Sequence, residues 1–189
     1  MIRQFELVER VQSYDPDADE EMLNRAYVYG LKKHGTQLRA SGDPYFSHPV
    51  EVAGILSEMR LDTASIVTGL LHDTLEDTDA TYEDLEQHFG PEVAALVAEV
   101  TDDKSLPKEE RKRLQIEHAP SLSPRARIVK LADKTCNLRD VVQDPPAGWP
   151  LKRKQEYFDW AKSVVDKISG TNPNLENAFA KAYANRPKS

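Results

Sequence analysis

The segment from Thr68 to Thr78, TGLLHDTLEDT, places an imidazole and three carboxylates close together. His72 and Glu76 are four residues apart, so on a helix they would share one face. Asp73 and Asp77 have the same spacing and would share a face beside it. Carboxylates crowded in this way repel one another unless a cation neutralises them. We therefore interpret the segment as part of a metal site with an acid–base pair beside it.

Two residues elsewhere in the chain extend this segment into a ligand set for one metal ion. His48 and Asp133 add an imidazole and a carboxylate to those of the His72-Asp73 pair. Two imidazoles and two carboxylates suit a borderline divalent ion such as manganese, iron, zinc or cobalt. Two alternatives stay open at this point. An adjacent His and Asp are commonly a solvated surface pair, and a buried ion pair with a nearby lysine or arginine would satisfy Asp133 equally well.

Helical periodicity accounts for the apolar residues on both sides of these ligands. A central helix is expected from Leu61 to Leu75, and it would carry the His72-Asp73 pair. Pro49 fits the first turn of the helix before it. Asp133 lies on an amphipathic helix expected over residues 124–142. Further helices are expected over residues 3–11, 17–34, 81–90, 91–100, 107–118 and 151–169, and from residue 173 onward.

Capping residues mark several of these helix ends. Asp17, after the turn at Asp15-Pro16, is the expected cap of the second helix, and Thr81 begins a capping-box pattern. Gly90 followed by proline predicts a break between two helices. The sequence contains no alternating strand pattern of useful length and no internal repeat. We therefore predict an all-α fold of about ten helices, forming a single domain over residues 1–189.

Composition narrows the class of protein further. A chain of 189 residues is long enough for one domain with a hydrophobic core. Its formal net charge of −7 argues against nucleic-acid binding, although it leaves room for a local basic pocket that binds a phosphorylated small molecule. The single Cys136 excludes an internal disulfide. Neither a signal peptide nor an apolar run of about 20 residues is present, so we expect a cytoplasmic protein without a membrane partner.

Five stretches of the sequence match the motifs of one family. They are PYFSHPVEVA at residues 44–53, LHDTLEDT at 71–78, VTDDK at 100–104, KLADKTCNLR at 130–139 and QEYFDWA at 155–161. In these motifs the chain resembles the hydrolase domain of the RelA/SpoT family, and more closely the small stand-alone alarmone hydrolases of the Mesh1 type. The resemblance extends from about residue 18 to residue 183.

This resemblance implies a helical HD-type domain that binds one manganese ion. It also implies removal of the 3′-pyrophosphate from guanosine 3′,5′-bis(diphosphate), or from its pentaphosphate relative, to give GDP or GTP and pyrophosphate. Glu76 and Asp77 match the pair that activates water, although their individual roles stay open. Such a metal ion acidifies bound water and polarises a phosphoryl oxygen, and a carboxylate can then orient the nucleophile. The metal ligands implied are His48, His72, Asp73 and Asp133.

The resemblance also implies substrate contacts on three segments of the chain. Arg39 and Ser41 match positions that approach the nucleotide, and an arginine there can stack on a base or bind a phosphate through two hydrogen bonds. Asn137 lies one helical turn after Asp133 and should face the same pocket. For these residues a surface charge or a capping hydrogen bond is the simpler interpretation.

Arg153 and Tyr157, also one turn apart, resemble a pair that contacts phosphate and sugar, with the same simpler alternative. Relatives often carry a second basic residue where this chain has Ala40. We expect that difference to weaken or redirect the phosphate contacts without affecting the metal.

The leading hypothesis is therefore a manganese-dependent alarmone 3′-pyrophosphohydrolase that acts on a guanine nucleotide. No room is left for a synthetase domain, so the chain is expected to degrade the alarmone. One alternative is an HD phosphohydrolase that acts on the 2′- or 3′-phosphate of another nucleotide. A second alternative is a catalytically silent module that binds the alarmone, although the intact Glu76 and Asp77 argue against it.

Overall fold

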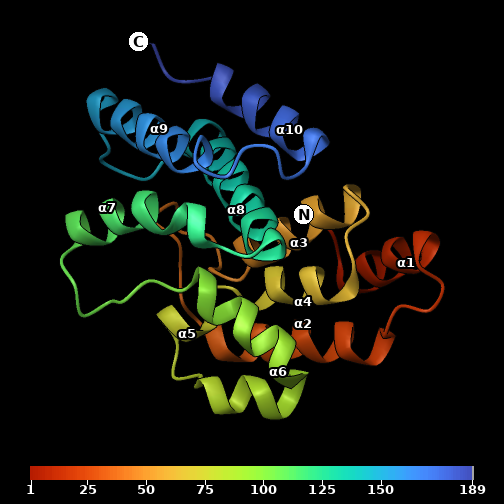
Figure 1. Cartoon of the computed structure of the whole chain (residues 1–189). Helices are drawn as coiled ribbons and strands as arrows, with labels where there is room; N and C mark the ends of the chain where they lie inside the picture. The colour runs from red at the N-terminus through yellow and green to blue at the C-terminus, as the bar shows by residue number, and fades with distance from the viewer. Residues whose placement is uncertain (189) are drawn as a thin grey trace. The chain divides into compact units, whose positions relative to one another are not determined.

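The computed structural model describes residues 1–188, in which ten α-helices and one short 3-10 helix are connected by loops (Figure 1). Over these residues the only extended pairing is an isolated bridge at Leu38 and Pro44. The prediction of an all-α fold with about ten helices is therefore confirmed. The helices are α1 Gln4–Tyr14, α2 Glu20–His34, α3 Ser47–Glu58, α4 Thr63–Leu71, α5 Thr74–Asp77, α6 Tyr82–Val100, α7 Lys108–His118, η1 Ala119–Ser121, α8 Pro124–Gln143, α9 Leu151–Val165 and α10 Pro173–Ala184.

Contacts within the chain divide it into two compact units. The N-terminal unit contains residues 1–37 and 44–101, and the C-terminal unit contains residues 38–43 and those from 102 onward. Both units contain buried apolar side chains. The prediction of one domain over residues 1–189 stays a prediction. No described helix is both long enough and apolar enough to cross a membrane.

Helix α4 is the centre of the N-terminal unit. Its residues from Ser65 to Leu71 are all buried, and it packs against α2, α3 and α6. Gly69 allows the close approach to α3, because a Cβ atom at this position would lie 2.8 Å from Leu56 Cδ1. The side chain of Asp62 caps the helix by accepting a hydrogen bond from the Ser65 amide. This packing fixes the end of α4, which the His72-Asp73 pair (the HD pair) follows directly.

The central helix does not continue from Leu61 to Leu75, so that prediction was wrong. Helix α4 ends at Leu71, and a single turn, α5, begins at Thr74. Asp73, between them, has φ −96° and ψ −3°, in the bridge region where helices commonly break. The Thr74 hydroxyl donates to the Leu71 carbonyl at 2.7 Å and satisfies the interrupted helix end. The shared-face argument for His72 and Glu76 therefore does not hold, because the two residues lie on different segments.

The local signals at the other helix ends were mostly correct. Thr81 forms the predicted capping box with Asp84, and Gly90 (φ 86°) interrupts α6 as predicted. Asp17 is not the cap of α2, however. Pro16 and Asp17 occupy the middle of a turn that Ala18 closes on Asp15. The helix begins after this turn, and Asp19 caps it.

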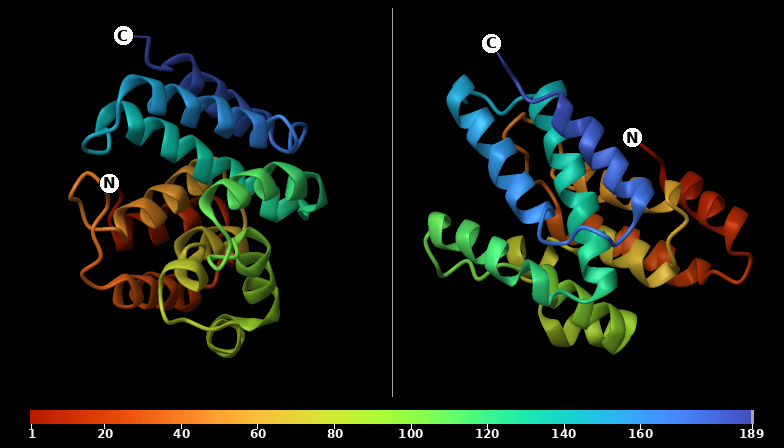
Figure 2. Two further views of the ribbon diagram at one scale, coloured as in Figure 1. Left: turned by 90° about the vertical axis from the view of Figure 1, so that its left-hand side faces the viewer. Right: turned by 45° about the horizontal axis from the view of Figure 1, so that its top comes forward.

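Helix α8 is the centre of the C-terminal unit. Its side chains are buried without interruption from Val129 to Cys136, and it packs against α9 and α10 (Figure 2). Ser123 caps it, accepting a hydrogen bond from the Ala126 amide. Such continuous burial is unusual for a helix segment that contains an aspartate and two lysines. Polar partners inside the unit must therefore satisfy these charges.

Candidate active site

Two imidazoles and a carboxylate gather in the N-terminal unit. His48 lies in the first turn of α3, and His72 follows the last residue of α4. Their ring centroids are 5.3 Å apart, and both side chains are buried. Asp73 reaches both rings, with one carboxylate oxygen 3.2 Å from His72 Nε2 and the other 4.0 Å from His48 Nε2.

The hydrogen bonding of His72 favours a metal ligand. Its Nδ1 atom lies 2.7 Å from the Gly69 carbonyl oxygen, which can only accept, so the proton must be on Nδ1. In the neutral ring Nε2 then carries a lone pair, and this atom faces an Asp73 oxygen. Two such electron-rich atoms attract a cation between them. A backbone carbonyl on the second ring nitrogen is also the usual support of a metal-bound histidine.

Tyr45 joins this group through a contact that the sequence did not reveal. Its hydroxyl lies 2.9 Å from Asp73 Oδ2 and 2.8 Å from Asp77 Oδ2. Burial, with the two nearby carboxylates, raises the pKa of Tyr45 far above its ordinary value. The hydroxyl therefore keeps its proton and acts as a donor. The motif PYFSHP contains Tyr45, but nothing in that pattern specified its partners.

The predicted catalytic pair lies on the single turn of α5. Glu76 and Asp77 are both partly buried. The Asp77 amide donates to the Asp73 carbonyl at 2.9 Å, and Gln37 donates to the Asp77 carbonyl at 2.7 Å. Asp77 is thus tied to the HD pair through its backbone and, through Tyr45, by its side chain.

Asp133, on α8 of the C-terminal unit, has two close partners. Lys134 Nζ donates to one carboxylate oxygen at 3.0 Å, and Asn137 Nδ2 donates to the other at 2.9 Å. Although burial alone would lower the pKa of Lys134, the Asp133 carboxylate raises it above its ordinary value. The ion pair that the sequence left open is therefore present. It does not exclude a metal, because a carboxylate has about four acceptor positions.

The loop that carries Arg39 and Ser41 is linked to α8 within the same unit. Arg39 forms an ion pair with Asp140 at 2.5 Å, and both side chains are 19% exposed. The Ser41 hydroxyl bonds to Asp43 in its own loop. Sequence reasoning missed Asp140, because nothing along the chain connects it to a residue about a hundred positions away.

Aromatic rings surround the other predicted substrate contacts. The Arg153 guanidinium lies 4.2 Å from the centre of the Trp149 ring. Tyr157 contacts the rings of Trp149 and Trp160, with centroid distances of 5.5 and 5.4 Å. Burial raises the pKa of Tyr157 to about 12. Lys134 lies 4.5 Å from the centre of the Trp160 ring. The two tryptophan rings thus each contact a cation.

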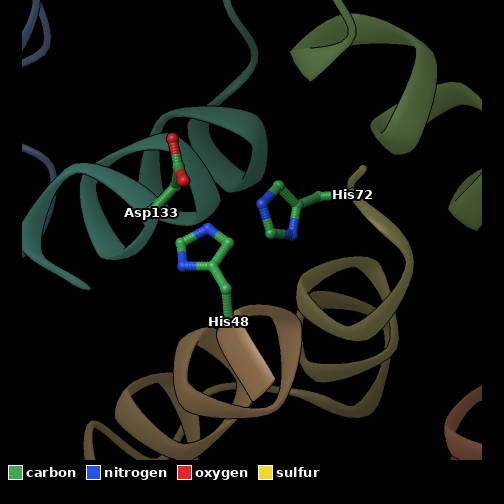
Figure 3. Close-up of side chains that lie close together, drawn as sticks. All are labelled: His48, His72 and Asp133. Atoms are coloured by element: carbon green, nitrogen blue, oxygen red, sulfur yellow. The ribbon is translucent and has the colours of Figure 1, made fainter. Parts of the chain in front are cut away.

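Three of the four predicted ligands meet the distance requirement for one metal ion. His48, His72 and Asp133 are all buried, and each offers a ligand atom within 4.8 Å of the others (Figure 3). Asp73, the fourth, contacts both imidazoles as described above. Imidazole nitrogens and carboxylate oxygens suit divalent ions from manganese to zinc.

Comparison with known proteins agrees with this description. The family model of the HD domain matches residues 26–159. The guanosine-3′,5′-bis(diphosphate) 3′-pyrophosphohydrolase MESH1 of Xenopus tropicalis is 50% identical over 84% of this chain and 91% of its own length. The GTP pyrophosphokinase rsh of Brucella ovis is 54% identical over 74% of this chain, but over only 19% of its own length.

A solved structure gives the same result. The metazoan ortholog of SpoT, described as hydrolysing ppGpp, superposes with a TM-score of 0.84 at 46% identity and covers 89% of this chain and 96% of that one. The chain therefore belongs to the HD-domain family. Within that family it is a member of the MESH1 type, as the identity and coverage show. The resemblance inferred from the motifs is confirmed.

Proposed function

We propose that this chain is a guanosine 3′,5′-bis(diphosphate) 3′-pyrophosphohydrolase that uses one manganese ion. The observation that carries the proposal is the buried group of His48, His72 and Asp133 in a chain 50% identical to a MESH1 enzyme. Its substrate would be a guanine nucleotide with a 3′-pyrophosphate. Water adds to the phosphorus attached to the 3′ oxygen. The bond between this phosphorus and the 3′ oxygen breaks, and pyrophosphate is released.

The residues fit a divalent metal ion. Asp73 would complete the ligand set, and the Gly69 carbonyl already orients the His72 ring for Nε2 ligation. When bound, the ion would acidify a water molecule and polarise a phosphoryl oxygen. Lys134 and Asn137 would hold the Asp133 carboxylate in a fixed orientation.

Glu76 and Asp77 would handle the proton of the attacking water. Both lie on α5, three and four residues after Asp73. A carboxylate there can accept the proton from water, and the proton finally reaches the 3′ oxygen of the departing nucleoside. Tyr45 donates toward Asp77, so Asp77 is the more restrained of the two. Glu76 is therefore our choice for the general base.

The C-terminal unit would bind the negative charge of the substrate. Arg39 and Arg153 can each bind a phosphate through two hydrogen bonds, with Tyr157, Ser41 and Asn137 as polar neighbours. Each arginine is held in advance, Arg39 by a carboxylate and Arg153 by an aromatic ring. Ala40 lacks the second cation of this loop, so we propose a weaker phosphate contact at this position.

The deciding experiment measures pyrophosphate release from a panel of nucleotides, with and without manganese. We expect release from guanosine 3′,5′-bis(diphosphate) only with the metal, and release about 10²- to 10⁴-fold slower from the Glu76→Ala variant. Release of orthophosphate from a nucleoside 2′- or 3′-monophosphate would favour an HD phosphohydrolase of other specificity. Nucleotide binding without any release would favour the silent binding module and refute the proposal.

A further inference from the structure

The single turn α5 cannot hold its shape unaided. It has four residues, far fewer than the roughly 12 an isolated helix needs to be stable in water. The same turn must nevertheless hold the proposed catalytic carboxylates at a fixed distance from the metal ligands. The surrounding structure must therefore supply this rigidity.

Several hydrogen bonds fix the backbone of the turn. Gln37 donates to the Asp77 carbonyl, while Thr74 and Thr78 donate to carbonyls one turn earlier at 2.7 and 2.6 Å. None of these bonds constrains a carboxylate. An aspartate side chain with a fixed backbone still rotates about two bonds, and that freedom costs catalytic rate if the geometry must be found anew at each turnover.

Tyr45 contacts the carboxylates themselves. Its oxygen lies 2.9 Å from Asp73 and 2.8 Å from Asp77, so a single hydroxyl links one side chain of the HD pair to one of the catalytic pair. The hydroxyl has one proton and donates to one of them at a time. At any moment one contact is therefore a hydrogen bond to a charged acceptor, which is stronger than one between neutral groups.

Tyr45 is itself held rigidly. Its ring stacks on that of His34 with a centroid distance of 4.9 Å and an angle of 27°. Its amide donates to the Gln37 carbonyl at 2.8 Å, and the Gln37 side chain bonds to His34 at 2.9 Å. The C-terminal end of α2 thus supports the tyrosine from one side, and the carboxylates lie on the other.

We infer that Tyr45 is a positioning residue that sets the distance between the metal ligand Asp73 and the catalytic Asp77. The inference rests on the proposed function and adds to it a role for Tyr45, to which the motifs assigned none. Tyr45 touches neither the metal nor the substrate in this role, since it acts through the two aspartates. Loss of its hydroxyl would remove the one contact that the two carboxylates share through this side chain.

The test compares two isosteric variants, Tyr45→Phe and Tyr29→Phe. Tyr29 is a matched control from the same unit, because its buried hydroxyl has no hydrogen-bond partner among the described residues. Manganese affinity is measured by calorimetry on the metal-free protein, and turnover is measured at saturating manganese. Thermal unfolding of each metal-free variant reports any general loss of structure.

We expect Tyr45→Phe to weaken manganese binding about tenfold, the usual cost of removing an outer partner of a metal ligand. At saturating manganese, kcat should also fall about tenfold, with KM within about twofold of the parent value. Tyr29→Phe should change neither quantity. A merely structural tyrosine would instead lower the unfolding temperature and leave metal affinity and kcat unchanged, and that result would overturn the inference.

Two further outcomes separate this inference from the proposed function. If kcat recovers fully at saturating manganese, the link to Asp77 is refuted. If the parent protein binds manganese but releases pyrophosphate from no nucleotide, the proposed function fails. In that case unchanged manganese affinity in Tyr45→Phe would also refute the link to Asp73, and a tenfold loss would support that link alone.

Discussion

The two units contribute opposite chemistry. In the N-terminal unit, α3 to α5 bring together two imidazoles and several carboxylates, joined by the Tyr45 hydroxyl. In the C-terminal unit, lysine and arginine side chains lie against aromatic rings or carboxylates. Asp133 also belongs to the C-terminal unit, where Lys134 donates to its carboxylate.

The difference shows how a chain of net charge −7 can act on a highly anionic substrate. Carboxylates that bind a metal and move protons would repel a pyrophosphate if they surrounded it. In the proposed function the carboxylates serve the metal, and the cations of the C-terminal unit bind the substrate. The partners that hold Arg39 and Arg153 also keep each cation in one orientation before the substrate arrives.

The strongest test of the N-terminal unit is His72→Ala. The variant loses a metal ligand, so we expect manganese affinity to fall by more than the roughly 100-fold that loss of an outer partner can cost, and turnover to become undetectable. Calorimetry and pyrophosphate release measure the two effects. His88→Ala is the control, because that imidazole is exposed on α6. If His72→Ala kept its manganese affinity, His72 would not be a metal ligand, and the N-terminal unit would not have the metal-binding role proposed for it.

Glu76→Ala separates metal binding from proton transfer inside the same unit. Loss of a general base typically slows the chemical step about 10²- to 10⁴-fold. We expect that loss in kcat, with manganese affinity changed by less than about twofold, because Glu76 is not among the proposed ligands. Glu86→Ala, an exposed residue of α6, is the control. Undiminished turnover in Glu76→Ala would assign the proton transfer to Asp77 instead.

Lys134→Met tests whether Lys134 compensates the buried charge of Asp133 in the C-terminal unit. Removal of one partner from a buried ion pair costs about 3–5 kcal/mol, because the other charge is left uncompensated. We expect the metal-free variant to lose about 3 kcal/mol of unfolding free energy in urea. Saturating manganese should restore part of it.

The control for this variant is Lys112→Met. Lys112 lies 5.4 Å from the same Trp160 ring as Lys134. Its hydrogen bond with Trp160 is donated by the indole Nε1 to the Lys112 backbone carbonyl, and the substitution keeps that carbonyl. We expect a loss below about 0.5 kcal/mol. Equal losses in the two variants would mean that the aromatic contact, and not Asp133, accounts for the stability of this region.

Asp140→Asn tests whether the carboxylate positions Arg39 for the substrate. We expect KM to rise threefold to tenfold, about 1 kcal/mol, with kcat unchanged, because a neutral amide orients the guanidinium less firmly. Steady-state kinetics with the guanine nucleotide measures both constants. Ser41→Ala, in the loop that carries Arg39, separates the effect of losing this ion pair from the effect of losing the Ser41 hydroxyl. A lower KM in Asp140→Asn would instead show that Asp140 competes with phosphate for Arg39.

The smallest expected effect comes from a surface pair away from these groups. Arg186 donates two hydrogen bonds to Asp159 at 2.8 Å, and these bonds lower the pKa of Asp159. A lowered folded-state pKa stabilises the protein above the unfolded value near 3.9 and loses that effect as the pH falls through the folded value. Asp159→Asn should therefore cost less than about 1 kcal/mol at pH 7 and a smaller amount at pH 2. Urea unfolding at the two pH values measures this, and an equal cost at both would exclude an electrostatic origin.

Local signals made much of the fold predictable. The capping box at Thr81, the cap at Ser123 and the break at Gly90 depend on residues within a few positions of one another. The break after Leu71 was not predictable in the same way. Apolar periodicity continues across it, and only the packing of α4 and the Thr74 hydroxyl mark the helix end.

The candidate site was likewise predictable only in part from the sequence. The sequence indicated which donor types were present, and the motifs indicated which positions to examine. It left open whether Asp133 would meet a lysine or a metal, and the structure shows the lysine as one of its partners. It gave no role to Tyr45 or Asp140, because their partners are 28 to 101 residues distant.

The sequence by itself determined most of the helices, several of their caps and the supply of imidazoles, carboxylates and cations, because these follow from side-chain chemistry and local backbone preference. Tertiary structure alone decided which donor atoms face one another. The proton on His72 Nδ1, the two contacts of Tyr45 and the carboxylate beside Arg39 each depend on segments that meet only after packing. Directional contacts of this kind require atoms placed within a few tenths of an ångström, and only a folded core fixes them so closely.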